Sequence, residues 1–241
     1  MNSAFNSKSA RTHDSFYADQ TESEPKESFK AILNLIQKKY FQSSVNLIDI
    51  GCACGDFPGF LSKASGLSVC GMDSLPLLIS QASIRYPGIQ FIEGSIEDKT
   101  ALPDNSYEII TVLGVLSIFD DLTSICMNLS KWIKIGGTIY VHGMFNPDPI
   151  DVFIRYKHAI YGQPGGLLES GWNIISQHSF EKLFLENGAQ RVVFHKFNLE
   201  IDLAKQNDPV RSWTEPLANG SKQIVNGLCL NQPQYIAEIS F

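Results

Sequence analysis

The sequence feature that most constrains the fold is an alternation of short apolar runs with segments of helical spacing between residues 45 and 144. The runs are rich in Ile, Leu and Val, as buried strands are, and turn residues separate them from the segments that follow. Short buried strands that alternate with helices specify a parallel sheet covered on both faces, which is a doubly wound α/β fold. The expected strands are residues 45–50, 67–72, 89–93, 108–113 and 138–144, and the expected helices are residues 56–64, 75–85 and 122–133.

Further elements are predicted on both sides of this alternation. A helix with one apolar face is expected before the first strand, with Ser23 as its N-cap and Pro25 in its first turn. The polar residues 1–22 are predicted to be flexible. Gly136 and Gly137 are predicted to end the helix that precedes the fifth strand. The C-terminal third is expected to hold helices at residues 152–158 and 179–187 and strands at residues 191–203 and 234–241.

Together these elements predict a mostly parallel, seven-stranded sheet with helices on both faces and an antiparallel C-terminal strand pair. Residues 23–241 are long enough to form one elaborated α/β domain, since single domains of this class reach about 200–250 residues. We therefore expect a single domain that follows a flexible N-terminal segment.

Composition narrows the class of partner. The formal net charge is −6 and Lys and Arg form no cluster, so neither nucleic acid nor an anionic membrane is an expected partner. No apolar run approaches the roughly 20 residues that a membrane-spanning helix needs, and the N-terminus lacks the apolar core of a signal peptide. The five cysteines are an odd number without paired metal-ligand spacing. We expect a cytoplasmic protein with reduced thiols, no metal site and no membrane insertion.

A glycine-rich turn joins the first expected strand to the next helix, in the run Asp49-Ile50-Gly51-Cys52-Ala53-Cys54-Gly55-Asp56. Glycines allow a sharp turn and a close approach of a ligand, at which the amides of the following helix point. Dinucleotide sites use the same device. The Asp49 carboxylate favours S-adenosylmethionine, because it suits an ammonium group and would repel a pyrophosphate. Asp73, about 20 residues beyond Gly51, can accept hydrogen bonds from ribose hydroxyls of either cofactor.

Over roughly residues 47–144 the chain resembles the class I S-adenosylmethionine-dependent methyltransferase family. The landmarks that carry the resemblance are the glycine turn, Asp73, the run Gly94-Ser95-Ile96-Glu97, and residues 102–110 and 132–137. Three positions depart from the family pattern: Ala53 replaces the middle glycine, at a slight cost in backbone freedom, Ser95 replaces an acid that contacts adenine, and Ile135 replaces a proline. The cofactor-binding residues that the resemblance implies are Asp49, Gly51, Cys52, Ala53, Gly55, Asp73, Ser74, Leu75, Ser95, Ile96, Leu113 and Gly114.

Several of these residues have a plainer interpretation. Asp73 could cap the next helix, and Leu75, Leu113 and Val115 could be core residues rather than walls of an adenine site.

The resemblance also implies direct displacement of the sulfonium methyl group by an acceptor. Where amine-methylating relatives carry Asn-Pro-Pro-Tyr, this chain has Leu113-Gly114-Val115-Leu116, so we expect a small-molecule or sugar acceptor with a hydroxyl as nucleophile. A hydroxyl profits from a general base. His142, toward the carboxyl end of the fifth strand, is the first candidate, although it could be a packed strand residue. His158 and His178 are further candidates.

Insertions near residues 146–172 and 204–232 are expected to cover the carboxyl edge of the sheet and to select the acceptor. The same insertions could instead form a homodimer interface. The tail, with the run Arg211-Ser212-Trp213-Thr214, loosely resembles methyltransferases encoded with bacterial surface-glycan enzymes. The expected acceptor-binding residues are Tyr17, Arg155, Tyr156, Trp172, Arg211 and Trp213.

Two other functions stay open at this point. An NAD-dependent oxidoreductase would use the same turn and Asp73, but the sequence has no recognisable catalytic Tyr and Lys pair and no second catalytic domain. A non-catalytic homologue could bind the cofactor as a regulatory subunit.

Overall fold

The structure is a computed structural model that describes residues 24–40, 45–65, 67–159, 168–199, 201–208 and 210–241. Three predictions fall outside the described residues. They are the flexibility of residues 1–22, the N-cap at Ser23 and the acceptor contact of Tyr17.

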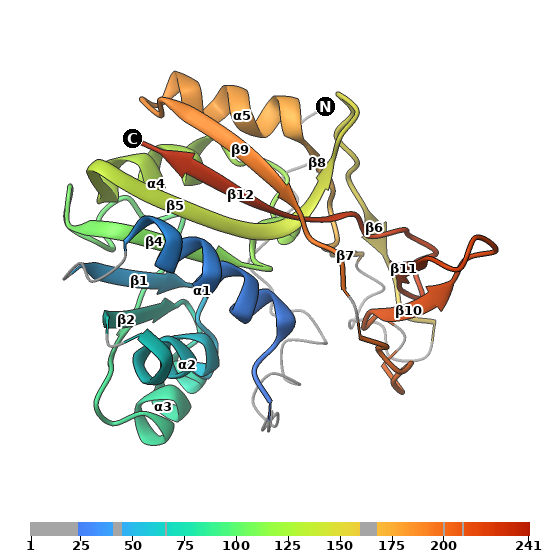
Figure 1. Ribbon diagram of the computed structural model, residues 1–241, viewed down its shortest axis with the longest axis horizontal. Helices are drawn as coiled ribbons and strands as arrows, with labels where there is room; N and C mark the ends of the chain where they lie inside the picture. The colour runs from blue at the N-terminus through green and yellow to red at the C-terminus, as the bar shows by residue number, and fades with distance from the viewer. Residues whose placement is uncertain (1–23, 41–44, 66, 160–167, 200, 209) are drawn as a thin grey trace.

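One mixed sheet with seven strands in a continuous path lies at the centre of the molecule (Figure 1). Its order is β3-β2-β1-β4-β5-β12-β9, and the first five strands are parallel. β12 runs antiparallel to both β5 and β9. The predicted fold class is therefore confirmed, including the antiparallel C-terminal pair. The strands are β1 (Asn46–Ile50), β2 (Ser68–Asp73), β3 (Gln90–Glu93), β4 (Tyr107–Leu113), β5 (Ile133–Asn146), β9 (Arg191–Lys196) and β12 (Gln234–Ser240), with the short β8 (Ile175–Ser176) paired to the end of β5.

Helices cover the sheet on both faces, because successive residues of a buried strand point in opposite directions. On β1, Leu47 joins a core layer with the first two helices, and Ile48 joins the layer on the other face with α4 and α5. The helix α3 lies against β2 and β3. The helices are α1 (Glu27–Lys39), α2 (Asp56–Ser65), α3 (Pro76–Arg85), α4 (Thr123–Trp132) and α5 (Gln177–Glu186).

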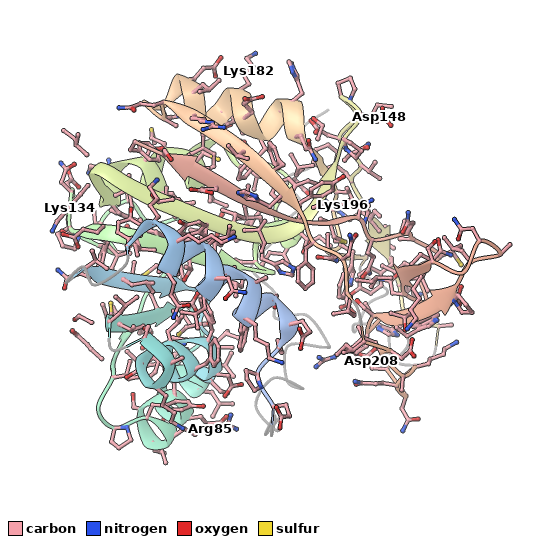
Figure 2. All side chains as sticks on the ribbon, viewed as in Figure 1. Arg85, Lys134, Asp148, Lys182, Lys196 and Asp208 are labelled. Atoms are coloured by element: carbon pink, nitrogen blue, oxygen red, sulfur yellow. The ribbon has the colours of Figure 1, made fainter. Side chains whose placement is uncertain are left out.

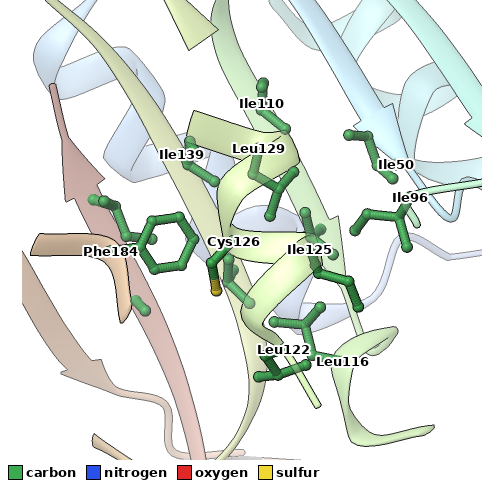
Figure 3. Close-up of a cluster of buried hydrophobic side chains, with 14 of the residues drawn as sticks. Ile50, Ile96, Ile110, Leu116, Leu122, Ile125, Cys126, Leu129, Ile139 and Phe184 are labelled. Atoms are coloured by element: carbon green, nitrogen blue, oxygen red, sulfur yellow. The ribbon is translucent and has the colours of Figure 1, made fainter. Parts of the chain in front are cut away.

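Figure 3 shows part of the layer under α4, where Ile125 and Leu129 pack toward Ile110 of β4 and Ile139 of β5. Each of these four side chains is fully buried. Burial of one such aliphatic side chain contributes roughly 1.5–3 kcal/mol, so this layer fixes the position of β4 and of the loop that follows it.

Two predicted helix boundaries are wrong. α1 begins at Glu27 with Lys26 at the N-cap position, so Pro25 precedes the helix and does not lie in its first turn. α4 ends at Trp132, and Gly136 and Gly137 lie inside β5. β5 begins directly after α4 because Ile133 already has extended backbone angles and pairs with Tyr107 of β4.

The helix predicted at residues 152–158 is absent from the described residues. Val152 instead forms a bridge with Ile174, and β6 (Arg155–Tyr156) pairs with β7 (Glu169–Ser170). This pairing forms because hydrogen bonds between residues far apart in the sequence outweigh the weak helix propensity of residues 152–158. One of them runs from the Ile154 amide to the Asn173 side chain. The predicted strand at 191–203 is also shorter, since β9 ends at Lys196.

Two small sheets lie beyond the carboxyl ends of the parallel strands (Figure 1). One is the β6–β7 pair, and the other is a hairpin of β10 (Trp213–Pro216) and β11 (Lys222–Val225), which lies within the insertion expected near residues 204–232. In open α/β sheets ligands bind at the carboxyl edge, so both small sheets stand beside the expected site. No helix within the described ranges is long and apolar enough to cross a membrane.

Candidate functional site

The turn between β1 and α2 requires glycine at two positions. Gly51 and Gly55 have φ angles of +75° and +81°, in the left-handed region that other residues rarely adopt. A Cβ atom at Gly51 would lie 2.3 Å from Cγ2 of Val115, and one at Gly55 would lie 2.6 Å from Cζ of Phe91. The turn is therefore fixed by backbone conformation and by close packing at once.

Ala53, in the middle of the turn, has a φ of +47°. The structure thus places an alanine in a conformation that costs L-residues about 1–2 kcal/mol, a larger strain than slight loss of backbone freedom. The neighbouring Cys52 and Cys54 are buried, and neither forms a disulfide within the described residues. Burial raises the pKa of Cys52 far above its ordinary value, so that this thiol is neutral.

Asp73 at the end of β2 holds the strained turn in place. Its Oδ2 accepts a hydrogen bond from the Ala53 amide at 2.9 Å, and its Oδ1 accepts one from the Leu75 amide at 3.0 Å. The N-cap position of α3 is Leu75, so Asp73 and Ser74 lie before the helix. The carboxylate joins the two loops that follow β1 and β2, at the place where a ribose would lie in the proposed site.

Asp49 is 3% exposed and shares the sheet face of α1 and α2 with Thr111 of β4. Oγ1 of Thr111 donates to Oδ1 of Asp49 at 2.7 Å. Burial raises the pKa of Asp49 to about 8; the Thr111 hydrogen bond opposes this rise and the negative charge of Asp73 adds to it. Sequence reasoning missed Thr111, although a hydroxyl within the apolar run of a buried strand was a usable signal.

The remaining predicted cofactor residues lie on the same edge. Ser95 follows β3, and its Oγ accepts from the Glu97 amide at 3.2 Å. Ile96 is buried, and its carbonyl accepts a hydrogen bond from Nδ2 of Asn128 at 2.9 Å. Gly114 is exposed with a φ of +70° and follows Leu113 at the end of β4. Four parallel strands thus deliver their predicted residues to one edge.

His142 lies beside Leu113 in the register of β4 and β5. Its ring meets that of Phe197 edge-on at 5.2 Å, and within the described residues its buried Nε2 has no hydrogen-bond partner. Burial lowers the pKa of His142 to about 4, and the positive charge of Lys26 acts in the same direction. The imidazole is therefore neutral at pH 7, but it is a weak base. His178 is exposed on α5, and the ring of His158 meets that of Tyr156 at 5.7 Å.

The predicted acceptor residues fall into two groups. Arg155, Tyr156 and Trp172 lie in or beside the β6–β7 pair. Arg155 forms an ion pair with Asp120, and the Tyr156 hydroxyl donates to Oε2 of Glu169 at 3.2 Å. Trp172 has a φ of +63°, which is unusual for a bulky residue.

The second group, Arg211 and Trp213, lies at the hairpin. Arg211 pairs with Asp208 at 3.8 Å, and Asp208 stands away from the main sheet (Figure 2). The Trp213 indole donates to Oε1 of Glu215 at 3.0 Å, and Nζ of Lys205 lies 4.4 Å from the centre of its ring. The two groups therefore lie in different small sheets.

Asn173 is a residue that sequence reasoning missed. It is 1% exposed, and its Nδ2 donates to the Phe119 carbonyl at 2.9 Å and to Oδ1 of Asp120 at 3.0 Å. Its own amide donates to the Ser117 carbonyl, and its Oδ1 accepts from Ile154. Asn173 thus fastens the segment after β5 to the loop after β4.

Comparison with known proteins agrees with this geometry. Residues 48–141 match a family model described as a methyltransferase domain. The chain is 28% identical over 95 residues to a demethylmenaquinone methyltransferase of Chlorobaculum tepidum, a match that covers 39% of each protein. It is 29% identical over 147 residues to a ribosomal protein L11 methyltransferase of Nitratiruptor, which covers 61% of this chain and 50% of that protein. These matches therefore span about half or less of the curated relatives.

The fold has close counterparts among solved structures. An S-adenosylmethionine-dependent methyltransferase structure from Methanosarcina mazei superposes with a TM-score of 0.60 at 15% identity, over 85% of this chain and 96% of that one. At this identity the likeness concerns the fold alone. Sequence match and fold agree over the strands that form the glycine turn, so residues 48–141 form a methyltransferase domain with the fold of the class I, S-adenosylmethionine-dependent enzymes.

Proposed function

We propose that the protein transfers the methyl group of S-adenosylmethionine to a small polar acceptor, with a hydroxyl as the preferred nucleophile. The observation that carries this proposal is a chain of contacts from the cofactor turn to the segment after β5. Val115 packs against Gly51, and the 3₁₀ helix Leu116–Ile118 follows directly. Asn173 then binds the Ser117 carbonyl. The segment that faces an acceptor is thereby held next to the cofactor turn.

We propose the described residues 146–159 and 168–176 as an acceptor cap. Four further contacts support this assignment: the Ser170 hydroxyl donates to the Ile118 carbonyl at 3.2 Å, Arg155 pairs with Asp120, and Asn173 binds both Phe119 and Asp120. A segment fixed by so many bonds at the carboxyl edge can exclude water and orient an acceptor. Arg155 then serves mainly to position the cap, because its guanidinium is already engaged.

Trp172 is the residue that we assign to the acceptor itself. Its left-handed backbone costs of order 1–3 kcal/mol, and such strain concentrates at functional sites. The adjacent Asn173 and Gly171 are buried and hold the residue in this conformation. An indole presented in this way offers a flat face to a sugar ring or another small acceptor. The hairpin with Arg211 and Trp213 is proposed as a second wall.

The cofactor, when bound, supplies an activated methyl group, so this chain's residues need mainly to align the acceptor and exclude water. Asp49 pairs with the ammonium group, and Asp73 accepts from the ribose hydroxyls. His142 can take the proton of a hydroxyl acceptor, because it is neutral and its Nε2 has no partner among the described residues. With its low pKa it is an accessory base rather than the main source of rate.

The names of the two relatives, one acting on a quinone precursor and one on a ribosomal protein, do not select an acceptor class. The proposal for a small polar acceptor rests instead on the cap and on the absence of a basic cluster in the sequence. The likeness of the tail to surface-glycan methyltransferases favours a sugar and remains a prediction.

The test is a transfer assay with labelled S-adenosylmethionine across small-molecule, glycan and lipid acceptors. Trp172→Ala is expected to lose transfer with unchanged affinity for S-adenosylhomocysteine, and Trp172→Phe, which keeps a flat apolar ring, is expected to retain most of it. Gel filtration accompanies both variants. Normal transfer by Trp172→Ala together with dissociation into smaller species would make the segment a dimer interface. Binding of cofactor without transfer to any acceptor would favour the regulatory homologue.

A further inference from the structure

The carboxyl group of Asp49 is buried. It accepts a hydrogen bond from the Thr111 hydroxyl at 2.7 Å, and within the described part of the chain no ion pair involves it. Thr111 is itself fully buried and also lies 3.4 Å from the Ile48 carbonyl. An isolated carboxylate in such a place is costly, and the group then prefers its neutral, protonated form.

Among the residues that the structure describes, the titratable groups around Asp49 do not supply a positive charge. Asp73 at the end of β2 is negative and acts against ionisation of Asp49. The thiols of Cys52 in the turn and Cys70 on β2 have pKa values raised by burial, as has the phenol of Tyr140, the partner of Thr111 on β5. Lys26, which precedes α1, acts on His142 instead.

We propose that S-adenosylmethionine binds with release of one proton from Asp49, and that Thr111 is the positioning residue that aims and stabilises the resulting carboxylate. This inference rests on the proposed cofactor site. In the free protein Asp49 is a neutral acid whose oxygen still accepts from Thr111. When the cofactor's ammonium group arrives, the O–H bond of Asp49 breaks, its proton passes to solvent, and the carboxylate pairs with the ammonium.

This exchange makes cofactor affinity depend on pH. Asp49 must lose its proton before it can pair, so below the titration of the free acid the dissociation constant falls about tenfold for each unit of rising pH. Above that titration the gain ends, and the affinity falls where the ligand's own amino group loses its proton. Thr111 sets the pH at which the affinity stops rising, because its hydrogen bond favours the charged form of Asp49.

The experiment is titration calorimetry of the full chain with S-adenosylhomocysteine, which carries the same amino-acid group. Between about pH 6 and pH 7 the ligand's amino group stays protonated. Comparison of two buffers with different heats of ionisation gives the number of protons released. The wild type is expected to release close to one proton per ligand, and Asp49→Asn, a neutral isostere, none.

Thr111→Val removes the hydroxyl with little change of shape. It is expected to weaken binding about 10-fold near neutral pH and to move the rise in affinity to higher pH, whereas Thr111→Ser restores both. A uniform loss of affinity at every pH would reduce Thr111 to a packing role and overturn its assignment. Tight binding without proton release overturns the proposal for Asp49 and leaves the proposed function intact, whereas no binding at any pH overturns both.

Discussion

The edge formed by β1 to β4 and the segment after β5 are built by different means. At the edge, the main chain sets the geometry: three positions of the glycine turn have positive φ angles, and the strands pair in regular parallel register. In the described residues 146–159 and 168–176, single side chains bind main-chain groups, as Asn173 binds Phe119 and Asp151 binds the Ser176 amide at 2.6 Å. In a parallel sheet, the main chain of the strands and turns positions a cofactor site, whereas the segment proposed to face the acceptor is held by individual polar side chains.

The largest expected effect concerns the main-chain geometry of the glycine turn. Gly51→Arg is expected to abolish binding of S-adenosylhomocysteine, because even a Cβ atom would overlap Val115 and the longer side chain fills the turn. Gly188→Arg is the matched control, since Gly188 has a φ of +95° but nothing within 4 Å of a Cβ atom. Calorimetry should show full affinity in the control at a stability cost of about 1–2 kcal/mol. Equal losses in both variants would show that backbone strain, and not closeness to the ligand, matters.

A substitution in the cap is expected to lower methyl transfer and to leave the affinity for the cofactor unchanged. Asn173→Ala removes the buried side chain that joins the cap to the loop after β4 through hydrogen bonds to Phe119 and Asp120, each worth roughly 0.5–1.5 kcal/mol. Methyl transfer is expected to fall at least about 10-fold while affinity for S-adenosylhomocysteine stays within about 2-fold. Asn34→Ala, at an exposed position of α1, is the control. A parallel fall in cofactor affinity would mean that the two regions are not separable.

Asp73 sharpens the comparison, because its carboxylate is expected both to stabilise the loops after β1 and β2 and to bind the cofactor. Asp73→Ala is expected to weaken cofactor binding by about 1–3 kcal/mol, the range for hydrogen bonds to a charged group. Since the carboxylate also holds the Ala53 and Leu75 amides, a modest fall in melting temperature is expected with it. Asp104→Ala, which removes an exposed acid paired with Lys131, should change neither quantity. An unaltered dissociation constant in Asp73→Ala would assign this residue to the loops alone.

The smallest expected effect concerns strain within the turn. Ala53→Gly relieves a left-handed alanine, worth about 1–2 kcal/mol, against an entropic cost of about 0.5–1 kcal/mol, so a net stabilisation of roughly 0.5–1 kcal/mol is expected. Ala64→Gly, at an exposed position of α2, should instead destabilise by about 1 kcal/mol. Denaturant unfolding of both variants measures the difference. Destabilisation by Ala53→Gly would mean that the methyl group makes contacts that outweigh the strain.

The sequence alone determined the parallel sheet, the glycine turn and the acid at the end of β2. These features are readable because each depends on near neighbours: apolar periodicity marks buried strands, and a tight turn demands glycine at fixed offsets. The landmarks also occur in an order that only this family's fold explains, as the match of residues 48–141 confirms. The positions that the sequence assigns to the cofactor lie at one edge of the sheet, and their contacts with the cofactor stay a prediction.

The tertiary structure alone decided which side chains meet. Thr111 and Asp49 are 62 residues apart, and Asn173 is 54 residues from Phe119, so no local pattern links them. The helix predicted at residues 152–158 failed for the same reason, because bonds to distant Asn173 and Ile174 outweighed local propensity. Periodicity in the chain records burial, whereas the partner of a buried polar group is set by how the strands are ordered in the sheet, and that order exists only in three dimensions.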